Sequence, residues 1–157
     1  MAAYESQIAA YEAGVLTVRG AAAGLTSAQR NQRVAPGTWS IQEVIVHLLD
    51  SDLACTHRMR RIVAESLPLL IAYDENAFID RLPAQDLDLA MVLDLFESNR
   101  RFTARWLRTL PSEAFAREGI HTQRGRISLL AIVEAYSKHV DHHMEFVEGK
   151  RAALSAS

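Results

Sequence analysis

Four segments of the 157-residue chain place apolar side chains three or four positions apart over long distances. This spacing follows the turn of an α-helix and gives each segment one apolar face. The chain has only 7 glycines and 4 prolines, which fall mainly between these segments, and no segment has a pattern typical of strands. The sequence therefore predicts an all-α fold, a four-helix bundle.

The predicted helices cover about residues 3–20, 41–65, 88–110 and 128–148. The second has the clearest start, because Ser40 is a good N-cap, Glu43 completes a capping box, and Trp39 can pack on Val44. Gly149 is expected to end the fourth helix. Residues 67–86 are predicted to form a long, irregular crossover between the second and third helices, and long connections often carry function.

Composition excludes several classes of protein. The length is typical of one domain, so residues 1–157 are expected to form a single domain. The net charge is −2 and no long basic run is present, so we expect neither a nucleic acid nor a membrane as partner. One cysteine and no recognisable signal peptide favour a cytoplasmic protein that acts on a small molecule.

Histidines are the most informative residues of the sequence, since three of the 6 lie within residues 138–143. His139 and His143 are one turn apart on the apolar face of the fourth helix, a spacing that lets one helix offer two imidazoles to one metal ion. His47, on the second helix, is a candidate third ligand. Three imidazoles suit zinc, nickel or iron and leave positions open for water or substrate. The alternative is that these histidines are hydrogen-bonded core residues that bind nothing.

The other histidines carry weaker predictions. His142 lies at the edge of the apolar face, where it could meet the rim of a pocket or a partner subunit. His57 and His121 have no partner at a useful spacing, and we expect them on the surface or in loops. Cys55 falls on the apolar side of the second helix and is expected in the core.

Two charged residues have both a structural and a functional interpretation. Arg100 falls on the apolar face of the third helix, where it needs a carboxylate partner, and Asp52 is the predicted one. Glu43 could orient His47 from one turn away, but closing the capping box is the simpler role. No catalytic residue can be assigned from the sequence.

Several short motifs occur in the order found in one known family. Residues 39–47 fit W-S-x-x-E-V-x-x-H, residues 121–125 fit H-x-x-R-G, and residues 139–143 fit H-x-x-H-H. The crossover contains Tyr73-Asp74-Glu75-Asn76, and the third helix carries Phe96 and Arg100. Together these motifs resemble the DinB superfamily, also described as DinB/YfiT-like metalloenzymes.

The resemblance implies a four-helix bundle with a long crossover, commonly dimeric, and a divalent metal held by three histidines. Carried onto this chain, the metal ligands are His47, His139 and His143. Family members with known chemistry resemble transferases that use low-molecular-weight thiols, so a thiol cofactor is implied beside the metal.

We therefore expect a metal-dependent enzyme, a thiol S-transferase or a hydrolase, whose metal activates a thiol or water for attack on a small electrophile. Residues expected in or around its pocket are Glu43, Ser51, Tyr73, Asp74, Arg100 and His142. The alternative is a non-catalytic, metal-binding stress-response protein whose bundle serves dimerisation or ligand binding. A second apolar set on the second helix favours a homodimer; it consists of Val46, Leu49 and Leu53.

Overall fold

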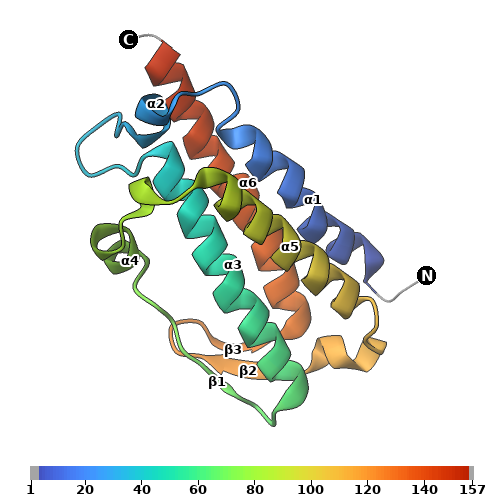
Figure 1. Ribbon diagram of the computed structural model, residues 1–157. Helices are drawn as coiled ribbons and strands as arrows, with labels where there is room; N and C mark the ends of the chain where they lie inside the picture. The colour runs from blue at the N-terminus through green and yellow to red at the C-terminus, as the bar shows by residue number, and fades with distance from the viewer. Residues whose placement is uncertain (1–3, 156–157) are drawn as a thin grey trace.

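The computed structural model describes residues 4–155, in which four long helices pack side by side (Figure 1). They are α1 (Glu5–Ala21), α3 (Ile41–Ala64), α5 (Leu89–Leu107) and α6 (Leu129–Ser155). Both α1 and α3 pack against α5 and α6, so α1 and α3 occupy opposite corners of the bundle. The predicted four-helix bundle is confirmed.

Capping residues set the starts of α3 and α5, and the cap of α3 is the predicted one. The Ser40 hydroxyl accepts a hydrogen bond from the Glu43 amide, and the Glu43 carboxylate accepts one from the Ser40 amide, which completes the capping box of α3. At the start of α5, the Asp88 side chain caps the amide of Ala90.

The expected end of the fourth helix at Gly149 is wrong, because α6 continues to Ser155. Beyond the glycine the helix still has a face against the bundle, on which Lys150 is buried and Leu154 packs on the apolar core. A glycine inside a helix costs only about 1 kcal/mol relative to alanine. Packing on both sides of Gly149 outweighs this cost.

The crossover is more ordered than the sequence suggested. It contains strand β1 (Leu69–Leu70), helix α4 (Glu75–Arg81) and a 3₁₀ helix (Ala84–Asp86) before α5 begins. Two further short helices, α2 (Ser27–Asn31) and a 3₁₀ helix (Ser112–Ala116), lie in the other connections. The Asp74 carboxylate caps α4 by accepting a hydrogen bond from the Ala77 amide.

A small sheet closes one end of the bundle, so the expectation that the chain has no strands is wrong. Strands β2 (Glu118–His121) and β3 (Gly125–Ser128) form a hairpin, and β1 pairs with β2 in parallel. Gly125 has a φ of 72° at the turn, a conformation that glycine adopts without strain. This sheet places the loop after β2 beside α3 and α6 (Figure 1).

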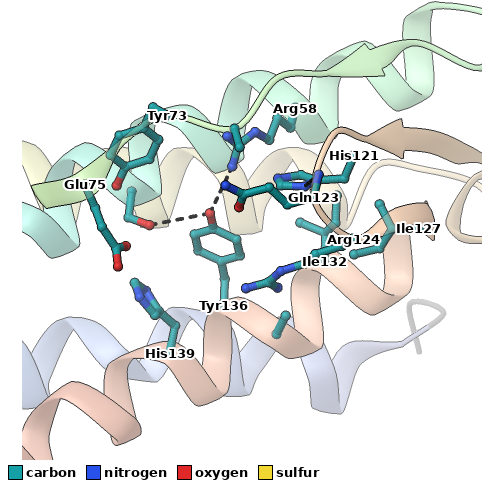
Figure 2. A pocket seen from close by; sticks show the side chains of 13 residues that line it. Arg58, Tyr73, Glu75, His121, Gln123, Arg124, Ile127, Ile132, Tyr136 and His139 are labelled. Carbon is teal, nitrogen blue, oxygen red and sulfur yellow. Dashed lines mark hydrogen bonds between the residues drawn. The ribbon is translucent and has the colours of Figure 1, made fainter. Parts of the chain in front are cut away.

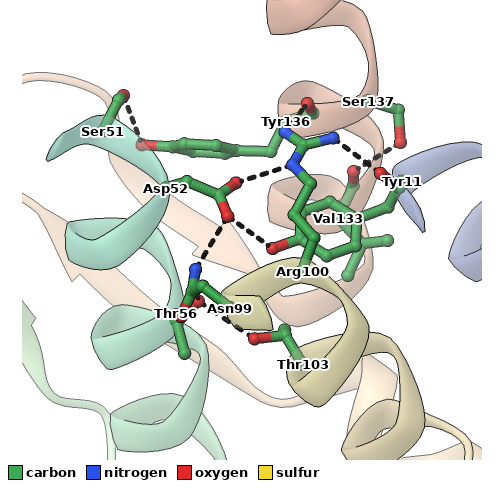
Figure 3. A network of polar contacts seen from close by, with 10 residues as sticks. All are labelled: Tyr11, Ser51, Asp52, Thr56, Asn99, Arg100, Thr103, Val133, Tyr136 and Ser137. Atoms are coloured by element: carbon green, nitrogen blue, oxygen red, sulfur yellow. Dashed lines mark hydrogen bonds and ion pairs between the residues drawn. The ribbon is translucent and has the colours of Figure 1, made fainter. Parts of the chain in front are cut away.

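The interior of the bundle contains two apolar clusters, one toward each end. The buried ion pair of Arg100 with Asp52 lies between them, and the Tyr11 hydroxyl donates a hydrogen bond to Asp52 (Figure 3). The predicted pairing of Arg100 with Asp52 is thus confirmed. Cys55 is fully buried in one of the clusters, as expected.

The structure removes the basis for the dimer surface proposed on the second helix. Val46 and Leu49 are 5% and 6% exposed, because they pack within the chain's own apolar cluster, and only Leu53 is exposed.

None of the helices between residues 4 and 155 combines the length and apolar character needed to cross a membrane.

Candidate functional site

The three histidines singled out in the sequence meet between α3 and α6. The Nε2 atom of His139 lies 3.3 Å from Nε2 of His47 and 3.0 Å from Nε2 of His143. One ring nitrogen from each of the three lies within 4.8 Å of the others. We call this cluster the histidine triad.

Burial keeps the imidazoles of the triad neutral at physiological pH. It lowers the pKa of His47 and of His143 to about 4. The pKa of His139 falls to about 3, because burial acts first and the neighbouring His143 and His47 add to it. Neutral imidazoles are the form that binds metal ions, so no proton has to leave before a metal can bind.

The donor set and its spacing fit a divalent metal ion. Zinc binds imidazole nitrogens at about 2.0–2.1 Å, which places the nitrogens of a tetrahedral site about 3.3 Å apart. The contacts of 3.0 and 3.3 Å within the triad match this spacing. Neutral imidazole also suits nickel and iron. His47, His139 and His143 are therefore the residues that could hold a metal.

An aromatic ring and a carboxylate flank the triad. The Trp39 indole packs 5.0 Å from the His47 ring and stacks parallel to the His143 ring at 6.4 Å. Oε2 of Glu75, at the start of α4, lies 3.9 Å from Nε2 of His47. In Figure 2 the Glu75 carboxylate points toward His139. The triad thus has an apolar cover and an acidic neighbour.

A pocket of about 130 Å³ opens beside the triad, and His139 forms part of its wall (Figure 2). It lies between α3, α6, the crossover and the β2–β3 loop. Ser51 and Tyr73, both expected in the pocket, line it. The other lining residues are Arg58, Ala72, Glu75, His121, Gln123, Arg124, Ile127, Ile132, Ala135 and Tyr136.

The polar wall of this pocket was largely missed from the sequence. Arg58 follows Ser51 by two turns on the same side of α3, a spacing that could have indicated it. Tyr136 precedes His139 by one turn on α6. Its hydroxyl accepts long hydrogen bonds from Ser51 (3.5 Å) and Arg58 (3.4 Å). Burial raises the pKa of Tyr136, so its phenol stays protonated.

His121 also belongs to the pocket, contrary to the expectation of a surface or loop residue. It is the last residue of β2 and is only 9% exposed. Its position depends on the pairing of β2 with β1 and β3, which the sequence pattern did not indicate. His57 is exposed, as expected.

The remaining sequence candidates lie outside the lining. Glu43 is engaged by the capping box and by Arg33, whose guanidinium donates two hydrogen bonds to it. Asp74 caps α4, and Arg100 is held inside the bundle by Asp52. His142 is exposed and packs edge-on against the Phe146 ring at 4.9 Å.

Sequence relatives match most of the chain's length. A protein of Oceanobacillus iheyensis named "Putative metal-dependent hydrolase" is 27% identical over 78% of this chain and 71% of its own. One of Bacillus licheniformis with the same description is 26% identical over 87% of this chain and 78% of its own.

A solved structure has the same fold. It is YfiT from Bacillus subtilis, described as "a probable metal-dependent hydrolase with an unusual four-helix bundle topology". The superposition gives a TM-score of 0.89 at 23% identity and covers 96% of this chain and 86% of YfiT. The family model of the DinB superfamily matches residues 12–147. This chain therefore belongs to the DinB superfamily.

Proposed function

We propose that the protein is a metal-dependent enzyme in which His47, His139 and His143 hold a divalent ion beside the substrate pocket. The observation that carries the proposal is the convergence of three Nε2 atoms at the wall of an open pocket. The names of the relatives, which describe metal-dependent hydrolases, support it. Three protein ligands leave room for a further ligand, as in catalytic rather than structural sites.

When bound, the metal would lower the pKa of a water or thiol at its open position and so supply a nucleophile near neutral pH. Oε2 of Glu75 is placed to take up the proton that this nucleophile loses. The Tyr136 phenol, kept protonated by burial, is placed to donate a hydrogen bond to the electrophile. Trp39 shields the other side of the triad from water.

Metal binding is tested by titrating the chelator-treated protein with zinc and with nickel. His47→Ala and His139→Ala should each weaken zinc binding more than about 100-fold, since each ligand contributes several kcal/mol. His142→Ala is the matched control, because this exposed histidine is the neighbour of a triad member and should leave affinity unchanged. Wild type that binds neither metal would refute the site.

Nickel binding has an independent optical readout. The chain has 2 tryptophans. Trp39 contacts the triad, whereas Trp106 packs against the apolar cluster that contains Cys55. In Trp106→Phe, nickel should quench the remaining fluorescence, and His139→Ala should abolish this quenching.

The choice between hydrolysis and thiol transfer follows from turnover with the metal-loaded protein. We expect a thiol nucleophile, and the assay pairs a model electrophile with bacillithiol, mycothiol or glutathione, against a thiol-free reaction that reports hydrolysis. Turnover that needs a thiol and is lost in His139→Ala supports a transferase, and thiol-independent turnover supports a hydrolase. Tight metal binding without turnover in any assay would favour the non-catalytic, metal-binding alternative.

A further inference from the structure

Arg58 is a buried guanidinium with spare hydrogen-bonding capacity at the end of the pocket remote from the triad. Its side chain is 9% exposed. Nη2 donates to the Ile71 carbonyl at 2.7 Å, and Nη1 makes the long contact to Tyr136. A guanidinium has five N–H donors, so most of those of Arg58 are not used by these two contacts.

No carboxylate of the chain neutralises this charge in the part that the structure describes. The ion pairs among residues 4–155 involve other arginines or His47, and none of them includes Arg58. Arg100 provides the contrast, because it is similarly buried yet has Asp52 at 3.0 Å. A buried charge without a partner is costly. The arrangement is therefore suited to a negative group supplied from outside.

Further donors surround Arg58 on the same wall. Arg124, Gln123 and His121 come from the end of β2 and the loop after it, and all three line the pocket with Arg58. Figure 2 shows Gln123 and His121 beside Arg58, and the Arg124 guanidinium nearer to α6. Burial, and then the positive charges of Arg58 and Arg124, lower the pKa of His121, which indicates how close these groups are. This wall is basic, whereas Glu75 makes the triad end acidic.

The basic wall and the triad lie within reach of one small molecule. Arg58 follows His47 by 11 residues, about 16 Å along α3. The Tyr136 side chain spans the interval, with its hydroxyl 3.4 Å from Arg58 and its ring 5.5 Å from the His139 ring. Ile127 and Ile132 add apolar side chains to the wall of the pocket.

We propose that the substrate carries a carboxylate, which Arg58 binds at the basic wall while the reactive group lies at the histidine triad. Paired donors of a guanidinium match the planar carboxylate. The Tyr136 hydroxyl accepts from Ser51 and Arg58, which leaves its own hydrogen for the ligand. The assignment of the reactive end rests on the proposed function; the carboxylate site at Arg58 can be tested separately.

The test is calorimetric titration of the zinc-loaded protein with succinate and benzoate, each compared with its neutral amide, and with inorganic phosphate. At least one carboxylate should bind ten-fold or more tightly than its amide. Arg58→Gln should weaken that binding at least ten-fold, and Arg58→Lys should recover part of it. Arg105→Gln, a change at an exposed arginine of α5, should stay within two-fold of wild type.

Several outcomes would overturn the inference. If Arg58→Gln binds the carboxylate as well as wild type, the ligand is on the metal and not on Arg58. Equal binding of acid and amide, tighter binding of phosphate, or no carboxylate binding at 20 mM would also refute it. Should Arg58→Gln fail to fold, the acid–amide comparison in wild type decides, with Arg124→Gln expected to weaken binding about three-fold. A protein that binds no zinc but shows Arg58-dependent carboxylate binding would refute the proposed function alone.

Discussion

The Nε atom of Arg100 lies 3.0 Å from Oδ1 of Asp52, and both side chains are 1% exposed. The remaining donors of the guanidinium reach the backbone of two other helices, at the carbonyls of Tyr11 (2.6 Å) and Tyr136 (3.0 Å) (Figure 3). Asn99 donates a further hydrogen bond to Asp52. This one residue therefore links α5 to α1, α3 and α6 in the middle of the bundle.

Breaking this pair from one side should be strongly destabilising. In Asp52→Asn the Arg100 guanidinium stays buried without a counter-charge, and we expect the free energy of unfolding to fall by about 3–5 kcal/mol. The double variant Asp52→Leu/Arg100→Met removes both charges and should be the more stable of the two. Urea unfolding of both variants measures the difference. A loss below about 1 kcal/mol in Asp52→Asn would contradict the assigned role of the pair.

Gly14 brings the backbone of α1 close to the Arg100 guanidinium. A Cβ placed on Gly14 would lie 2.5 Å from Nη1 of Arg100 and 3.2 Å from Val140. The guanidinium cannot move aside easily, because Asp52 holds it. Gly14→Ala should therefore lower the thermal midpoint, although alanine normally stabilises a helix by about 1 kcal/mol relative to glycine.

Gly149→Ala is the matched control for this prediction. Gly149 lies inside α6, and a Cβ there would have no heavy atom within 4 Å among its described surroundings. This substitution should raise stability by about 0.5–1 kcal/mol. An increase of the same size in Gly14→Ala would show that the close approach does not constrain residue 14.

The metal-free protein should lose stability as the pH falls from about 6.5 toward 4. Burial lowers the pKa of His47 and His143 to about 4 and that of His139 to about 3, whereas unfolded histidine titrates near 6.5. In this interval the unfolded chain binds protons that the folded chain does not. Each histidine therefore lowers the free energy of unfolding by up to about 1.4 kcal/mol per pH unit.

Urea unfolding at several pH values in the presence of a chelator measures this slope. His47→Gln removes one of the three groups and should flatten the dependence between pH 6.5 and 4.5. Carboxyl groups with lowered pKa values, such as that of Glu43, affect the pH dependence of the free energy of unfolding mainly below this interval. An unchanged slope in His47→Gln would mean that the histidine titrates alike in the folded and unfolded chain.

Local patterns in the sequence were sufficient for the long helices. The Ser40–Glu43 capping box fixes the start of α3 through neighbours in the sequence, and helical spacing alone puts His139 beside His143. The partner of Arg100 was also predictable, because a buried guanidinium on an apolar face needs a carboxylate.

Features that depend on pairing between distant segments could not be predicted. The strands have two to four residues each, too few for a periodic pattern, and Leu70 meets His121 only because the crossover passes the hairpin. The same pairing brings His121 and Arg124 into the pocket that Arg58 lines. Helix α6 likewise runs through Gly149, because packing on the bundle outweighs a local preference.

Glu43 provides the last test, since it lies one turn from His47 but is bound elsewhere. Its carboxylate accepts hydrogen bonds from the Ser40 amide at 2.7 Å and from Arg33 at 2.6 Å, so it acts on the start of α3. Glu43→Gln should lower the free energy of unfolding by about 1 kcal/mol and change zinc affinity less than two-fold. If the Glu43 carboxylate oriented His47, its replacement would instead lower zinc affinity about 10–100-fold. Zinc titration of this variant beside Ser40→Ala, which weakens the same cap without touching the carboxylate, separates the two roles: a loss of affinity in Glu43→Gln alone would assign Glu43 to the metal site.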